Sequence, residues 1–272
     1  MKQPQAETKH GSPRVFNRVV CAVDESDGSL EAVRQAGAIA GEAAHVVLVH
    51  ALDPLHEIWD APPYKALETA AAINERAAAV LERARSVLGT RTHPDARVIE
   101  GKEVETLLEL VDTGRHCLLA VAATGTRRRL TGVLTGALVT EVVRRAPCSV
   151  LIARPADPAA KFPRSIVVGI DGSDHSAAAF AAAVSLAEGA GAQLEPLVAL
   201  GGKRIDLEAI RTMLRGRRFA EDERPAADAL AGVDADLLVV GSRGLHGLAA
   251  LGSVSERVAH ASASSVLVIR PP

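Results

Sequence analysis

Short apolar runs alternate with helical patterns along the chain. In the first half, five apolar runs predict strands at Arg18–Val23, His45–Leu52, Val98–Glu100, Cys117–Ala122 and Ser149–Ala153. Between them, apolar spacing and Ala/Leu/Glu/Arg-rich composition predict helices at about Ser29–Gly41, Tyr64–Leu88, Val104–Val111 and Val133–Arg145. Near-continuous apolar strands separated by helices are typical of a parallel sheet covered on both faces. The pattern therefore predicts an α/β fold.

The second half repeats this pattern. Val19–Ser29 (VVCAVDESDGS) is similar to Val167–Ser176 (VVGIDGSDHS), and Asp171 follows Asp24 by 147 positions. Near the other end, APCSVLIAR, which ends at residue 154, matches SASSVLVIR, which ends at residue 270, at an offset of 116. The second copy is thus 31 residues shorter in its middle, and its second helix is predicted at about Asp206–Gly216.

The repeat divides the chain into four parts. Residues 1–14 form a polar tail, residues 15–154 the first domain and residues 164–272 the second domain. Residues 155–163 (PADPAAKFP) contain three prolines and no periodicity, which predicts a linker.

Composition narrows the function classes. The net charge of −2 gives no overall bias toward nucleic acid or an anionic membrane, and the 2% aromatic content is too low for a platform that stacks single-stranded bases. No apolar run reaches the roughly 18 residues that span a bilayer, so we expect a cytoplasmic protein with neither a membrane nor a nucleic-acid partner. The three widely spaced cysteines predict buried, reduced thiols, and no Cys/His spacing indicates zinc.

Two motifs lie where ligands bind in such sheets, beyond the carboxyl ends of the strands. The first, D-x-S-x-x-S, follows the first strand of each copy, and Ser173 or Asp174 is expected to cap the next helix. The second is Gly241–Val258 (GSRGLHGLAALGSVSERV), in which glycines precede a helix. These glycines either form turns before a capped helix or let the backbone approach a phosphate at the helix N-terminus. Neither a GK[ST] loop nor a G-x-G-x-x-G dinucleotide loop after the first strand is present.

This ordered set of motifs resembles the universal stress protein family in both copies, so the chain looks like a tandem form. The resemblance implies two five-stranded parallel sheets of strand order 3-2-1-4-5, with dimerisation through the last strand. Some members of this family of stress-response proteins bind ATP and others do not. By position, the implied contacts of ATP, with or without Mg²⁺, are Asp171, Gly172, Ala199, Gly241, Gly244, Gly252, Ser253, Val254 and Ser255.

Both copies depart from the family pattern. ATP-binding members carry nine residues between G-x-x-G and G-[S/T], whereas Leu245–Leu251 is only seven residues long. In the first copy, either Ala122 and Gly125 take the two glycine positions, or Gly125 and Arg128 do. One glycine is lost in both alignments, and Ala137 stands where the second copy has a serine. A weaker second site would use the residues at corresponding positions, Asp24, Ala51, Gly125 and Gly136.

The sequence leaves three functions open. The first is a nucleotide-binding regulatory protein that is not an enzyme and acts on an unidentified protein partner. The second is a nucleotide-independent scaffold, and the third is a slow ATPase. The basic run Arg127–Arg129 is either a solvated loop tip or a set of anion contacts that replace glycine amides. We also expect Ser149–Ala153 to pair with Ser265–Ile269, either within one chain as a pseudo-dimer or between chains in a homo-oligomer.

Overall fold

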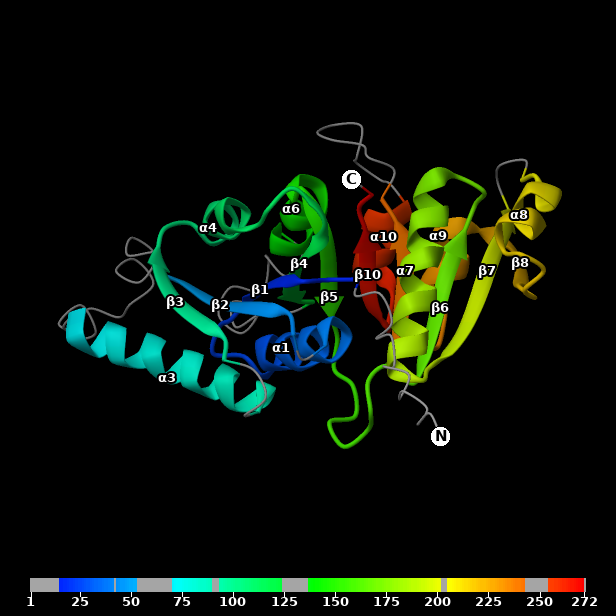
Figure 1. Ribbon diagram of the computed structural model, residues 1–272. Coiled ribbons are helices and arrows are strands. Elements are labelled where there is room, and N and C mark those ends of the chain that lie inside the picture. The colour runs from blue at the N-terminus through cyan, green and yellow to red at the C-terminus, as the bar shows by residue number, and fades with distance from the viewer. Residues whose placement is uncertain are drawn as a thin grey trace, which may run out of the picture.

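The computed structural model describes residues 15–41, 43–52, 70–89, 93–123, 137–201, 205–242 and 254–271. Within these residues, one sheet of ten strands runs through the molecule in the order β3-β2-β1-β4-β5-β10-β9-β6-β7-β8 (Figure 1). The first half supplies β1 (Arg18–Ala22), β2 (His45–Leu52), β3 (Asp95–Glu100), β4 (Gly114–Ala122) and β5 (Cys148–Ala153). The second half supplies β6 (Ser165–Ile170), β7 (Gln193–Gly201), β8 (Ala220–Pro225), β9 (Leu237–Gly241) and β10 (Ser265–Ile269).

Each half has the predicted strand order 3-2-1-4-5, and all strand pairs inside a half are parallel. The halves meet where β5 pairs antiparallel with β10, with Leu151 directly opposite Leu267. The two terminal strands therefore pair within one chain, as predicted, and neither remains an apolar edge. The outer edges are β3 and β8, whose charged and largely exposed residues disfavour pairing with another chain.

Helices cover both faces of the sheet. One face carries α1 (Asp27–Ala40), α3 (Ala70–Leu88), α7 (Asp174–Ala190) and α8 (Leu207–Met213). The other face carries α4 (Glu103–Leu110), α6 (Ala137–Arg145), α9 (Ala226–Ala231) and α10 (Val254–Ala261). Because both faces are covered, the central strands are almost completely apolar, which is the pattern visible in the sequence.

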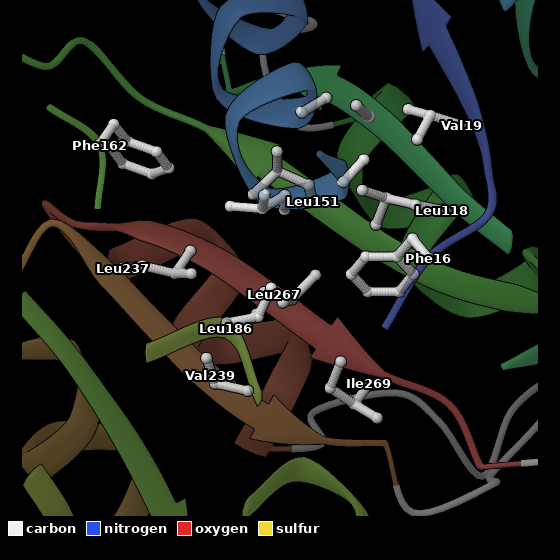
Figure 2. Packing of buried hydrophobic residues seen from close by; sticks show 14 of the residues in the cluster. Phe16, Val19, Leu118, Leu151, Phe162, Leu186, Leu237, Val239, Leu267 and Ile269 are labelled. Atoms are coloured by element: carbon white, nitrogen blue, oxygen red, sulfur yellow. The ribbon is translucent and has the colours of Figure 1, made fainter. Parts of the chain in front are cut away.

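The apolar core continues across the seam between the halves. On the face of α1 and α7, Leu118 and Leu151 from the first half share a cluster with Leu237 and Leu267 from the second half, and all four are fully buried. Figure 2 shows Leu151 and Leu267 close together in this cluster. The seam is therefore built like a domain interior.

Two arginines also join the halves. Arg154 follows β5 and Arg270 follows β10, at equivalent positions. Nη2 of Arg154 donates to the carbonyl oxygen of Ala259 in α10 at 2.6 Å, while Nη2 of Arg270 donates to the carbonyl oxygen of Val143 in α6. Since Ala259 also follows Val143 by 116 positions, the arrangement is pseudo-symmetric. We call this pair of arginines the arginine clasp. Each guanidinium holds the carboxyl-terminal turn of the other half's last helix, where unpaired carbonyls favour a cation.

The predicted element boundaries were mostly right within one or two residues, but two strands begin earlier than predicted. β3 begins at Asp95 and not at Val98, and β4 begins at Gly114 and not at Cys117. Among the missed residues of β3, Asp95 and Arg97 are charged and exposed, as is common on an edge strand, so these residues form no apolar run. The predicted helices that begin at Tyr64 and Val133 start outside the described residues and are described from Ala70 and Ala137.

Candidate functional site

The strand order reverses between β6 and β9, and their carboxyl ends mark the place where open parallel sheets bind ligands. Asp171 directly follows β6. Because Ile170 pairs with Val198, the next residues along the two strands, Asp171 and Ala199, lie side by side. Gly241 ends β9 on the other side of β6. The fold thus gathers Asp171, Gly172, Ala199 and Gly241 at the carboxyl ends of the strands of the second half.

The D-x-S-x-x-S motif of the second half caps a helix. Oδ1 of Asp171 accepts hydrogen bonds from the backbone N of Ser173 at 3.1 Å and from Oγ of Ser173 at 2.5 Å. The same Ser173 Oγ accepts from the backbone N of Ser176 at 3.2 Å, which makes Ser173 the N-cap of α7. The capping prediction is therefore confirmed for Ser173, and not for Asp174.

The first half builds the same turn. Oδ1 of Asp24 accepts from the backbone N of Ser26 at 3.0 Å and from its Oγ at 2.5 Å, and Ser26 caps α1 through the backbone N of Ser29 at 3.1 Å. Asp24 lies next to Ala51 of β2, as Asp171 lies next to Ala199. Because both halves share this geometry, helix capping accounts for the repeated motif, and the motif alone does not distinguish a binding half from a non-binding half.

The glycines do distinguish the halves. Gly172 has φ +82, a conformation that favours glycine, whereas Glu25 holds the equivalent position without a positive φ. At Gly241, an added Cβ would lie 2.5 Å from the carbonyl oxygen of His175 and 3.1 Å from its Cβ. Gly241 therefore lets the end of β9 pack closely against the first turn of α7.

Strand register identifies the first-half counterpart of Gly241. Gly241 pairs with Ile269, and Ala122 pairs with Ala153, so Ala122 and Gly241 are equivalent. This register supports the alignment that places Ala122 and Gly125 at the two glycine positions, and not the alignment that uses Arg128. The counterpart of His175 is Gly28, so the first half has its glycine on the helix and the second half has it on the strand.

Comparison with known proteins agrees with this architecture. A family model described as the universal stress protein family matches residues 16–154 and 217–270. The chain belongs to the universal stress protein family. A universal stress protein of Mycolicibacterium smegmatis (strain ATCC 700084 / mc(2)155) is 28% identical over 285 residues, which cover 93% of this chain and 97% of the relative.

Two solved universal stress proteins show different extents of similarity. The crystal structure of one from Archaeoglobus fulgidus DSM 4304 covers 94% of this chain and 96% of its own, with a TM-score of 0.66 and 19% identity, and so shares the fold. A universal stress protein in complex with cAMP is 28% identical and covers 52% of this chain and 99% of its own, with a TM-score of 0.37. At that TM-score, its ligand says nothing about this chain.

The family match does not extend over the whole candidate site. Asp171, Gly172 and Ala199 lie in the part of the second half between the two matched segments, whereas Gly241 lies inside the second segment. Val254 and Ser255 are the first residues of α10, and Ser255 is buried. Other predicted contacts lie outside the described residues, namely Gly125, Gly136, Gly244, Gly252, Ser253 and the run Arg127–Arg129.

Two further features are absent from the described part of the chain. It contains no group of three or more His, Cys, Asp or Glu side chains placed to hold a metal ion. Within the same ranges, no helix is both long enough and apolar enough to cross a membrane.

Sequence reasoning missed two features near the site. His175 meets Gly241 through its backbone, and a contact of that kind leaves no pattern in the sequence. The arginine clasp, in contrast, had a visible signal, because both copies of the last strand are followed by arginine at the repeat offset.

Proposed function

We propose that this universal stress protein binds ATP or a related adenine nucleotide, mainly through its second half, and acts as a regulatory protein and not as an efficient enzyme. The observation that carries the proposal is the meeting of Asp171, Gly172 and Gly241 at the switch point between β6 and β9. The carboxylate of Asp171 suits a ribose hydroxyl or a base amino group, and the exposed Gly172 presents backbone without a side chain.

The residues that follow Gly241 in the sequence also favour the second half as the nucleotide-binding half. Gly244, Gly252 and Ser253 precede α10, and a helix N-terminus with small residues before it favours a phosphate. The first half has Glu25 in place of Gly172 and Ala122 in place of Gly241. Its Ala137 replaces Ser253 and removes a hydroxyl donor worth about 0.5–1.5 kcal/mol. We therefore propose that the first half binds nucleotide at least tenfold more weakly.

The central test is titration calorimetry of the full chain with ATP and Mg²⁺. We expect about one site per chain. Asp171→Asn keeps an acceptor oxygen for the turn to Ser173 but removes the charge, so affinity should fall by roughly tenfold to a hundredfold, as for the loss of a charge-assisted bond of about 1.5–3 kcal/mol. Asp24→Asn makes the same change in the matching turn and should leave binding unchanged.

A second variant addresses the phosphates. Gly244→Val places a branched side chain in the predicted phosphate path and should weaken binding of ATP. Two equal sites, or a larger effect of Asp24→Asn than of Asp171→Asn, would show that the halves are assigned wrongly. Absence of binding at millimolar ATP would favour the nucleotide-independent scaffold. A phosphate-release assay that shows steady turnover would favour the slow ATPase.

A further inference from the structure

Two of the three cysteines are neighbours in the first half. Cys117 lies on β4 and Cys148 on the neighbouring strand β5, where the register is irregular, since Cys148 pairs with Gly114 and the next residue, Ser149, pairs with Leu118. Both side chains belong to the same buried cluster, with exposed fractions of 4% and 0%. The Cys148 thiol donates a hydrogen bond to the sulfur of Cys117. This hydrogen bond brings the two sulfurs into contact, as formation of a disulfide requires.

An arginine lies on each side of this pair. On β1, Arg18 pairs with Cys117, and Nε of Arg18 lies 3.2 Å from a carboxylate oxygen of Asp112. On the other side, the backbone N of Arg270 donates to Oγ of Ser149 at 3.1 Å, which brings Arg270 beside Cys148. The two thiols therefore lie between two guanidinium groups, one of which belongs to the arginine clasp.

These surroundings give the two thiols different roles. The hydrogen bond from Cys148 is the main cause that lowers the pKa of Cys117 to about 7, and Arg18 lowers it further, while burial and the charge of Asp112 oppose the shift. The same hydrogen bond is the main cause that raises the pKa of Cys148, with burial adding to it and Arg270 opposing it. The two opposite shifts make Cys117 the more readily ionised thiol of the pair and Cys148 the thiol that keeps its proton.

The surroundings of the pair differ from those of the third cysteine, Cys21, and the second half has no equivalent pair. Cys21 is completely buried, and burial raises its pKa to about 12, so it should be inert. Cys117, in contrast, is 4% exposed and directly follows the exposed His116. In the second half, Asp236 and Ser264 occupy the positions that correspond to Cys117 and Cys148 by strand register and repeat offset. The thiol pair is therefore a feature of the first half.

We propose that Cys117 and Cys148 are a peroxide-reactive thiol pair that closes into an intrachain disulfide. The Cys117 thiolate attacks a peroxide oxygen of hydrogen peroxide, the O–O bond breaks, and the departing hydroxide takes a proton to become water. The sulfur of Cys148 then attacks the sulfenic acid of Cys117. The S–O bond breaks, and hydroxide leaves with the Cys148 proton as a second water. Two thiols are oxidised and one peroxide is reduced to two waters.

The disulfide would tie β4 to β5 beside the arginine clasp. It would enclose residues 118–147, a segment that includes the glycine positions of the first half. Cross-linking a loop restricts the unfolded chain, so the oxidised protein should unfold at a higher denaturant concentration than the reduced protein. This inference does not depend on nucleotide binding.

The test is treatment of the folded, full-length protein with hydrogen peroxide, followed by alkylation and peptide mass spectrometry without reduction. We expect a peptide that joins Cys117 to Cys148, with Cys21 recovered as a free thiol. Because thiolate is the reactive form, oxidation should be about tenfold slower at pH 6 than at pH 8.

Three variants separate the roles. Cys148→Ser introduces the residue that the second half already has at this position, and it should let a dimedone-reactive sulfenic acid accumulate on Cys117. Cys117→Ser should abolish oxidation at both positions, whereas Cys21→Ser should oxidise like the wild type. A wild-type map without the Cys117–Cys148 peptide, or with Cys21 oxidised at the same rate, would overturn the proposal even if a variant failed to fold.

Discussion

Replacing Arg154 by methionine should loosen the joint between the halves. The Arg154 guanidinium donates through Nη2 to Ala259 at 2.6 Å and through Nη1 to Ser264 at 3.1 Å, both to backbone carbonyl oxygens of the second half. Methionine keeps much of the apolar stem but has no donor, so the variant leaves these carbonyls without their partner. The β5–β10 ladder itself is not altered by the change.

The size of the effect follows from these bonds. A hydrogen bond to a charged group contributes about 1.5–3 kcal/mol, and a cation at a helix carboxyl terminus adds about 0.3–1 kcal/mol. Burial of the guanidinium opposes this gain, as the lowered pKa of Arg154 indicates, and methionine avoids that cost. We therefore expect Arg154→Met to lose about 2–4 kcal/mol. Arg270→Met should lose somewhat less, because Arg270 makes one such side-chain bond among the described contacts, to Val143.

Urea denaturation followed by circular dichroism measures this loss, with Arg257→Gln as the control. Arg257 lies on the same helix as Ala259, but its ion pair with Asp228 is about half exposed and should contribute less than about 1 kcal/mol. The variant that replaces both clasp arginines should unfold in two separated transitions, because only the ladder and the shared core then couple the halves. If Arg154→Met were no less stable than Arg257→Gln, the clasp would not stabilise the joint.

Two further stability predictions use single substitutions. Gly241→Ala should lower the free energy of unfolding by about 1–3 kcal/mol, because its Cβ would overlap the His175 carbonyl oxygen. The control Gly189→Ala in α7 meets open space and should be neutral or slightly stabilising in the same urea assay. Equal stability of the two variants would contradict the close contact. Asp236 accepts hydrogen bonds from Arg164, and these bonds lower the pKa of Asp236. Its contribution to the free energy of unfolding is therefore fully present above the ordinary pKa of aspartate and is lost as the pH falls through the lowered pKa. The stability difference between wild type and Asp236→Asn should accordingly shrink between pH 7 and pH 3, and a constant difference would refute the linkage.

The sequence predicted the fold well because central parallel strands must be apolar on both faces. Such strands appear as continuous runs, as for Cys117–Ala122 and Ser149–Ala153, and the repeat offsets then relate one half to the other. The edge strand β3 was predicted three residues too short, since Asp95 and Arg97 are exposed and the stretch Asp95–Arg97 contains no apolar run. The ends of an edge strand are set by the backbone hydrogen bonds to its single neighbouring strand, and the local sequence does not reveal this pairing.

The candidate site was less predictable. Capping by Ser173 could be predicted because capping depends on residues a few positions apart. The packing role of Gly241 could not, because it depends on how closely β9 approaches α7, and the contacting residues Gly241 and His175 are 66 positions apart in the chain. The thiol pair was missed for the same reason, since Cys117 and Cys148 become neighbours only through the pairing of β4 with β5.

The two halves differ where the fourth strand approaches the helix that follows the first strand. In the second half the strand residue must be small, because an added Cβ at Gly241 would overlap the backbone carbonyl of His175. The second half places Gly241 on the strand and His175 on the helix, whereas the first half places Ala122 on the strand and Gly28 on the helix. Only the second half ends its fourth strand on glycine at the switch point, with the first turn of α7 held close beside it. The first half keeps the fold but has alanine at that strand end, and its distinctive chemistry, the thiol pair, lies near the opposite end of β4. This division is the physical reason to expect nucleotide in the second half and thiol oxidation in the first.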